Sequence, residues 1–192
     1  MCGRYTLRAD PAEVARAAGA GGGPAFRPRY NVAPTQDVLA YRAGVNSGAE
    51  AVLLRWGLIP SWAKDPAIGN RMINARAESI AEKPAFRAAF RRRRCAIAAD
   101  GFYEWKKLAK GKQPYLVRLA GDRPFAFAGL WEGWRGPDGV SIETCAIVTT
   151  TANALVARIH DRMPVILTGA AIGDWVATPP ERVDALEALL VP

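Results

Sequence analysis

The chain has 192 residues, of which 50% are hydrophobic and 23% are charged, a composition typical of a globular domain with a core of its own. The sequence contains no long apolar run and no N-terminal signal pattern, so we expect no membrane span, no secretion and a cytoplasmic location. A net charge of +8 favours a polyanionic partner, although the abundance of arginine, alanine, glycine and proline is also what a coding bias toward G and C produces.

The first half of the chain is expected to consist mostly of strands and irregular segments. Residues 3–8 alternate as a short strand does, and Asp10-Pro11 opens a helix that Gly19 ends. The proline-rich residues 24–36 predict a loop without regular structure, and strands at 37–42 and 51–58 follow, joined by a polar turn. After an irregular run to residue 70, we expect residues 71–77 to be extended and helices to form from residue 78 and over 85–93.

The second half reads as a series of strands. Residues 95–106 predict a buried strand that breaks at Asp100-Gly101 and resumes, where the glycine indicates a bulge or a ligand close to the backbone. Strands at 114–120, 124–131 and 142–150, a short helix ending at residue 159, a strand at 165–167 and two short helices follow. We therefore expect one domain over residues 1–192 with an α+β fold, in which short helices flank a mixed, mostly antiparallel, barrel-like sheet.

Two clusters suit either a plain surface or contact with nucleic acid. Four consecutive arginines, Arg91 to Arg94, end the helix at 85–93, and such runs either form a solvated face or bind phosphate. Trp56 and Trp62 lie in a segment rich in glycine and proline, where they either cover the core from outside or stack on bases.

Cys2 offers a particular chemistry. Removal of Met1, by an aminopeptidase or by the protein itself, would leave a residue that carries both a free α-amine and a thiol. Their ordinary pKa values, about 8 and about 8.5, leave both groups partly reactive near neutral pH. The amine can condense with an aldehyde to an imine, and the thiol can then close a five-membered thiazolidine ring. The alternative is a cysteine without a role.

Three polar residues could assist Cys2. His160 is the only histidine, and a lone histidine either moves protons or makes structural hydrogen bonds. Glu104 stands among aromatic residues, where desolvation would raise its pKa, unless it faces solvent. Asn74 lies in an apolar extended stretch and could orient an imine or a sugar hydroxyl, or cap a turn. With three widely spaced cysteines and one histidine, no metal site is expected, and we expect no cofactor.

Six blocks in this order and spacing resemble the SRAP domain, the family of SOS-response-associated proteins that process abasic sites in single-stranded DNA: MCGRYTL, RYNVAPTQ, WGLIPSW, INARAES, ADGFYEWKK and IHDRMPVIL. The resemblance spans residues 2 to about 168. Members of this family usually run beyond the last helix into a final extended segment, whereas this chain ends at Pro192.

The resemblance implies that the protein removes its own Met1 and that Cys2 forms a covalent thiazolidine link with the ring-opened sugar of an abasic site. It places the active residues at Cys2, Asn74, Glu104 and His160. It places the DNA-contacting residues at Arg4, Asn31, Pro34, Trp62, Arg76 and Arg162. The arginines among them are also expected to favour the Cys2 thiolate electrostatically.

The resemblance also implies a partner and two activities. The implied partner is single-stranded DNA with abasic sites, bound by a monomer that associates with the nucleoid when on DNA. The implied activities are a hydrolase acting on its own N-terminus and a lyase-type reaction on abasic DNA.

Two other functions fit the same residues. An N-terminal-nucleophile amidase or cysteine peptidase could use Cys2 with Asn74, Glu104 and His160, and it would turn over peptides or amides without DNA. A plain single-strand-binding module could use the arginines, with Trp56, Trp62 or Trp105 for stacking, and it would bind intact and abasic strands equally and reversibly, whether or not Cys2 is present.

Overall fold

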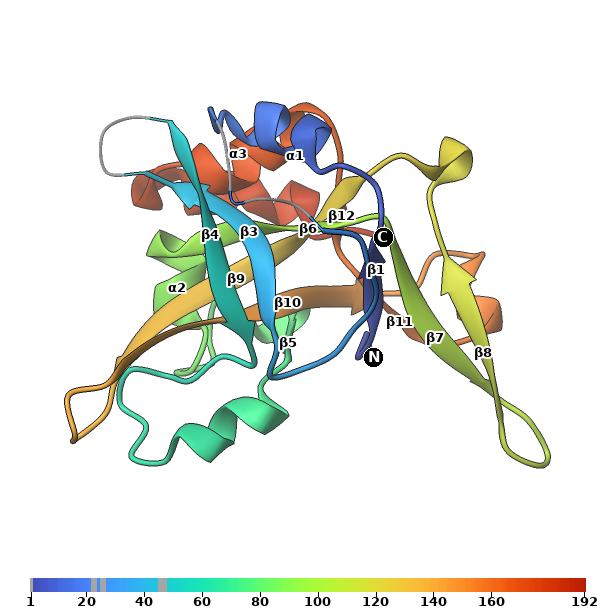
Figure 1. The fold of residues 1–192 in the computed structure, drawn as a ribbon, viewed down its shortest axis with the longest axis horizontal. Helices are drawn as coiled ribbons and strands as arrows, with labels where there is room; N and C mark the ends of the chain where they lie inside the picture. Colours follow the sequence, from blue (N-terminus) through green and yellow to red (C-terminus); the bar gives the residue numbers. More distant parts are fainter. Residues whose placement is uncertain (1, 22–23, 25–26, 45–47) are drawn as a thin grey trace.

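The protein is built around a closed barrel in a computed structural model that describes residues 2–21, 24, 27–44 and 48–192. Within these residues, the barrel strands follow one another in the order β10-β4-β3-β6-β9, and β9 pairs with β10 to close the ring (Figure 1). Only the β4–β10 pair in this ring is parallel, and the other pairs are antiparallel. The ring comprises β3 (Asp37–Ala43), β4 (Ala49–Trp56), β6 (Arg94–Ala99), β9 (Phe125–Arg135) and β10 (Ser141–Thr151).

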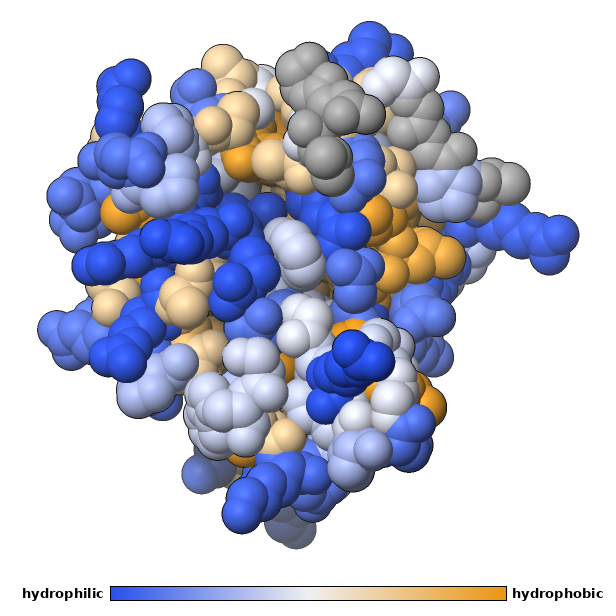
Figure 2. Space-filling model, turned by 90° about the vertical axis from the view of Figure 1, so that its left-hand side faces the viewer, coloured by the Kyte–Doolittle hydropathy of each residue, from blue (hydrophilic) through white to orange (hydrophobic). Residues whose placement is uncertain are grey.

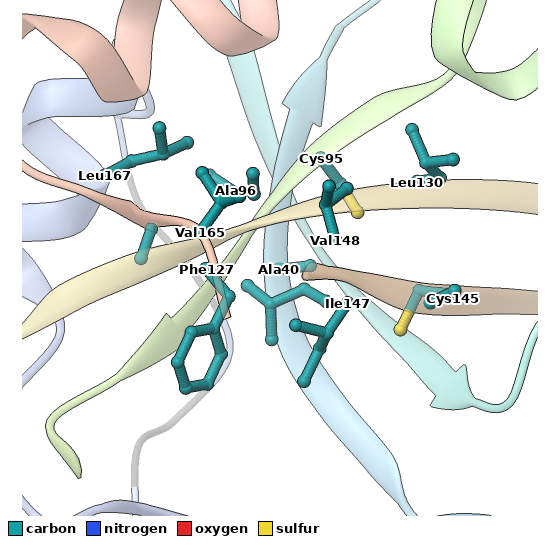
Figure 3. Packing of buried hydrophobic residues seen from close by; sticks show 14 of the residues in the cluster. Ala40, Cys95, Ala96, Phe127, Leu130, Cys145, Ile147, Val148, Val165 and Leu167 are labelled. Atoms are coloured by element: carbon teal, nitrogen blue, oxygen red, sulfur yellow. The ribbon is translucent and has the colours of Figure 1, made fainter. Parts of the chain in front are cut away.

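Small and branched side chains fill the barrel. Ala40, Cys95, Phe127 and Ile147 come from four different strands and all are fully buried (Figure 3). A Cβ atom at Gly129 would lie 2.8 Å from Ile97 Cδ1, so this position on β9 has no room for a side chain. The barrel is therefore a packed core, and reactive groups that need access must lie at its ends or edges.

A second sheet lies beside the barrel in the order β2-β1-β7-β8. Its strands are β1 (Tyr5–Leu7), β2 (Arg29–Val32), β7 (Gly101–Lys107) and β8 (Lys112–Val117). β7 follows β6 after the single residue Asp100, so the predicted break in the strand over 95–106 is the point where the chain passes from one sheet to the other. The β7–β8 hairpin projects away from the barrel (Figure 1).

Helices are short in the described part of the chain. α1 (Ala12–Ala18) and α3 (Ala170–Ala177) lie side by side over one end of the barrel (Figure 1). As predicted, the Asp10 carboxylate accepts a hydrogen bond from the Ala12 amide at 2.9 Å, and Gly19 ends α1 with a φ of 79°. The remaining elements are η1 (Pro66–Arg71), β5 (Asn74–Arg76), η2 (Ala77–Ser79), α2 (Arg87–Arg92), η3 (Ala120–Asp122), η4 (Val156–Arg158), β11 (Arg162–Pro164), β12 (Ile166–Leu167) and η5 (Pro180–Leu189).

The α+β, barrel-like prediction is confirmed, and several local predictions are corrected. The proline-rich stretch 24–36 contains β2, which pairs with β1. The helix expected from residue 78 is only the single 3-10 turn η2, and the one over 85–93 shortens to α2. The expected turn between β3 and β4 includes residues 45–47, which lie outside the described residues.

Neighbouring side chains, rather than a ligand, crowd Gly101. A Cβ atom there would lie 2.9 Å from Arg118 Cγ and 3.0 Å from Thr6 Oγ1. The predicted close approach to the backbone is therefore made by the protein's own side chains.

Two of the four arginines in the run are bound to other parts of the protein. Arg94 is buried and donates to the carbonyl oxygens of Trp175 and Phe90, while Arg93 pairs with Glu132 at 2.6 Å. A solvated or phosphate-binding role is left to Arg91 and Arg92, which are exposed.

The face shown in Figure 2 is largely hydrophilic, and its apolar residues form separate patches. Among the described residues, no helix is long and apolar enough to span a bilayer.

Candidate active site at the N-terminal strand

β1 lies in the middle of the second sheet and positions Cys2. Tyr5 pairs with Val32 of β2 on one side and with Phe102 of β7 on the other. The amide of Tyr103 donates to the carbonyl of Arg4 at 2.9 Å. The residues before β1 therefore run antiparallel to the part of β7 that carries Glu104.

Asn74 holds the backbone of Cys2. Its Nδ2 atom donates to the Cys2 carbonyl at 2.9 Å, across 72 residues of sequence. Asn74 begins β5, which pairs in parallel with β10 opposite Ile147, so the barrel wall fixes its position. The Oδ1 atom of Asn74 is buried and has no hydrogen-bond partner among the described residues. A buried acceptor of this kind is costly, and it is available to an N–H or O–H group that enters the site.

Glu104 completes a group that we call the Cys2 cluster: Cys2, Asn74 and Glu104. Cys2 is fully buried and Glu104 is 1% exposed. Burial first, and then the negative charge of Glu104, raise the pKa of the Cys2 thiol well above its ordinary value. The expectation that nearby arginines would favour the Cys2 thiolate is thus wrong in this state of the protein.

A second group forms around Arg162, the first residue of β11. Its guanidinium donates through Nη1 and Nη2 to the two carboxylate oxygens of Glu78, with Nη2 to Oε2 at 3.0 Å, and Nη2 also donates to the Thr149 carbonyl at 2.7 Å. Arg76, at the end of β5, is exposed and pairs in register with Thr149. Arg76 and Arg162, two of the three arginines predicted to contact DNA, thus lie on strands that flank β10.

His160 is positioned just before β11. Its Nδ1 atom lies 3.0 Å from the Arg162 amide and 2.8 Å from Asp161 Oδ1. One nitrogen cannot both accept from the amide and donate to the carboxylate. We assign the hydrogen bond to the backbone amide, because the side chain of Asp161 is 85% exposed and competes with water. In this arrangement Nδ1 is an acceptor and Nε2 carries the proton.

The remaining predicted DNA contacts lie on the second sheet and on loops. Arg4 Nη1 donates to Asn31 Oδ1 at 3.0 Å, so these two residues are neighbours at β1 and β2. Pro34 is half-buried in the turn after β2. Trp62 is 60% exposed and lines a hollow together with Lys64 and Arg71.

The tryptophans of the predicted stacking surface separate into two kinds. Trp56 is fully buried, and its indole donates to the Ile73 carbonyl at 2.9 Å, so a stacking role for this residue is wrong. Trp105 is 36% exposed on β7. Only Trp62 and Trp105, of those named in the sequence analysis, present enough surface for a base.

Sequence reasoning missed two residues that organise these groups. Glu78 lies two residues after Arg76 within INARAES. A carboxylate so close in sequence to an arginine that is expected to bind phosphate could have indicated an ion pair in this region. The sequence pattern at Asp100 indicates only a break in the strand. In the structure the buried carboxylate of Asp100 accepts hydrogen bonds from Thr6 Oγ1 at 2.5 Å and from the amides of Arg8 and Ala9 at 2.8 and 2.9 Å. Across the described residues, no group of three or more His, Cys, Asp or Glu side chains is arranged to hold a metal ion.

The chain that folds into this barrel, with a buried cysteine before its first strand, matches a known protein family. The family model described as SOS response associated peptidase (SRAP) matches residues 1–192. The chain therefore belongs to the SRAP family.

Curated relatives carry a common name. The chain is 46% identical over 198 residues to abasic site processing protein YoqW of Bacillus subtilis, a match that covers 100% of this chain and 87% of the relative. It is 35% identical over 182 residues to abasic site processing protein HMCES of Gallus gallus, covering 79% of this chain and 54% of that protein.

Solved structures share the fold. A protein from Bacteroides thetaiotaomicron matches with a TM-score of 0.85 at 26% identity, over 98% of this chain and 86% of that one. A phage-related protein from Bordetella bronchiseptica matches with a TM-score of 0.77 at 31% identity, over 100% of this chain and 90% of that one.

Proposed function

We propose that this protein captures abasic sites in single-stranded DNA by forming a thiazolidine between Cys2, freed of Met1, and the sugar aldehyde, and that the link shields the lesion. The observation that carries the proposal is the Cys2 cluster, in which an asparagine and a glutamate from distant strands meet the one residue that could carry both an amine and a thiol. The name shared by the relatives, abasic site processing protein, supports the choice of substrate.

The first steps use the amine rather than the thiol. Glu104, with His160 as a second candidate, moves the proton that opens the sugar ring to its aldehyde. The Cys2 amine adds to the aldehyde carbon, and loss of water gives an imine. Asn74 Oδ1, a buried acceptor, is placed to receive a hydrogen bond from the amine or from a sugar hydroxyl. Positioning the two reactants together supplies much of the rate.

Ring closure then uses the thiol. The sulfur bonds to the imine carbon while the C=N double bond becomes single, and the thiol proton passes to the nitrogen, with Glu104 as the relay. A buried, protonated thiol suits this order, because it does not compete with the amine for the aldehyde. His160 is a candidate to protonate the linkage for reversal.

The cationic residues hold the DNA backbone in this proposal. Arg4, Arg76 and Arg162 neutralise phosphates beside the lesion, while Asn31, Pro34 and Trp62 line the strand. Affinity for single-stranded DNA should therefore fall as salt rises. Since an abasic site has no base, the site needs no group that reads one.

The test is a denaturing gel with single-stranded DNA that contains one abasic site, together with an intact-mass measurement. Wild type should lack Met1 and give a heat-stable shifted band. Cys2→Ala should give no heat-stable band, while trapping with borohydride should still yield an amine adduct if Met1 is removed. Cys95→Ala serves as the matched control, since it removes a buried thiol in the barrel, and it should link normally. A heat-stable band with Cys2→Ala, or none with wild type, rejects the proposal.

A further inference from the structure

Glu78 occupies an unexpected place for a carboxylate in a protein that binds DNA. It accepts from both terminal nitrogens of the Arg162 guanidinium, the paired geometry that arginine also forms with phosphate. The side chain of Glu78 is 52% exposed, whereas that of Arg162 is 14% exposed. The carboxylate thus covers the outward edge of the guanidinium, where an approaching strand would meet it.

The Arg162 guanidinium is not fully satisfied by this arrangement. Its Nε atom is buried and has no hydrogen-bond partner among the described residues. A buried donor without an acceptor is costly. A phosphate that reached the guanidinium could offer Nε the acceptor that Glu78 does not provide.

The charge of Arg76, as well as that of Arg162, affects the pKa of Glu78. Its hydrogen bond with Arg162, and then the positive charges of Arg162 and Arg76, lower the pKa of Glu78. The carboxylate is therefore ionised at neutral pH and neutralises part of the positive charge that the two arginines would offer to DNA.

We propose that Glu78 stands in for a DNA phosphate in the free protein, and that a phosphate must displace it from Arg162 before the strand is seated. This inference rests on the proposed DNA-binding role of Arg76 and Arg162. The displacement lowers the affinity for any single strand, so an intact strand leaves quickly, and only a strand whose aldehyde reacts with Cys2 is retained.

The experiment measures binding of an intact, fluorescently labelled oligothymidine by anisotropy over a range of salt concentrations. Glu78→Gln removes the charge that competes with phosphate. It should bind severalfold more tightly than wild type at low salt. The plot of log affinity against log salt should become steeper, because a carboxylate no longer offsets part of the positive charge that meets the strand.

Glu82→Gln is the matched control. Glu82 lines the same hollow as Glu78 and is exposed, and its substitution makes the same change in net charge. It should leave the salt slope unchanged. Glu78→Asp, which keeps the charge on a shorter side chain, should give a smaller gain than Glu78→Gln and covers the case in which the glutamine variant does not fold.

The outcomes separate the two proposals. If wild type shows no salt-dependent binding at all, the proposed function fails. If wild type binds but Glu78→Gln binds equally or more weakly with an unchanged slope, then Glu78 merely holds Arg162 in place, and this inference alone is overturned.

Discussion

At the scale of single residues, the site depends on one hydrogen bond between distant parts of the chain. Asn74 reaches the Cys2 carbonyl from β5, and its second polar atom stays available. An asparagine is suited to this place because it donates and accepts within one planar group, whereas a carboxylate only accepts. The role of Asn74 can therefore be tested by keeping its shape and removing its donor.

Asn74→Asp should slow formation of the heat-stable link by about tenfold or more, because the carboxylate cannot donate to the Cys2 carbonyl and adds negative charge near Glu104. The measurement is the rate of band shift with protein in excess over abasic DNA. Binding to an intact strand should change little, since the arginines remain. An unaltered rate of linkage would remove Asn74 from the mechanism.

At the scale of elements, Asp100 ties β1 to the junction between β6 and β7. Its carboxylate binds Thr6 and the amides of Arg8 and Ala9, so the strand that carries the N-terminus is held from its far end. Arg8 Nε adds a contact with the same carboxylate at 3.2 Å. Removing this carboxylate would leave two backbone N–H groups without their acceptor, and the Thr6 hydroxyl would keep only the Gly101 carbonyl, at 3.3 Å.

Asp100→Ala should lower the free energy of unfolding by about 2–4 kcal/mol and slow linkage as well, because β1 would no longer hold Cys2 against Asn74. Urea unfolding measures the first effect and the gel assay the second. Thr6→Val removes only one of the contacts, so it should cost less. Equal stability of Asp100→Ala and wild type would contradict the assigned tether.

The elements also show what sequence can and cannot predict. The β3–β4 hairpin and the long strands β9 and β10 follow from alternation of apolar residues and clear turns. β2 escapes prediction because its neighbouring prolines suggest a loop, and its pairing with β1 depends on tertiary contact that no local pattern reveals. The burial of Arg94 cannot be predicted for the same reason, since two of its carbonyl acceptors, those of Trp175 and Thr178, lie more than 80 residues away in sequence.

The candidate site also has residues that the sequence predicts and contacts that it does not. Motif resemblance named Cys2, Asn74 and Glu104, and the structure brings these three together. The motif resemblance could not reveal that Glu78 pairs with Arg162 or that Asp100 holds β1, because both contacts depend on which strands become neighbours. The residue types that could react can be identified in the sequence, whereas the contacts that position these residues are known only from the three-dimensional structure.

At the scale of the whole molecule, stability should decline at high pH. Burial raises the pKa of the thiols of Cys2, Cys95 and Cys145, and that of the Tyr5 hydroxyl, above their ordinary values. In the unfolded chain these thiols ionise near pH 8.5, while in the folded protein they stay protonated. The stabilisation is therefore complete below about pH 8.5 and is lost as pH rises.

The free energy of unfolding should fall above about pH 8.5 by up to about 1.4 kcal/mol per pH unit for each thiol. Urea unfolding in the presence of a reductant, at several values between about pH 7 and 10, measures the slope. Cys95→Ala should be less stable at neutral pH but show a shallower decline. A flat profile across this range would contradict the burial of the thiols.

The six tryptophans are distributed unevenly between interior and surface, with Trp56 and Trp175 fully buried, Trp134 at 5% and Trp62 at 60% exposure. This contrast gives the protein an intrinsic optical reporter. Acrylamide should quench mainly the red-shifted part of the emission, which comes from Trp62 and, less strongly, from Trp105. A strand bound along the hollow beside Lys64 and Arg71 should protect the contribution of Trp62, so its position can be followed by fluorescence without any label, with Trp62→Phe as the reference.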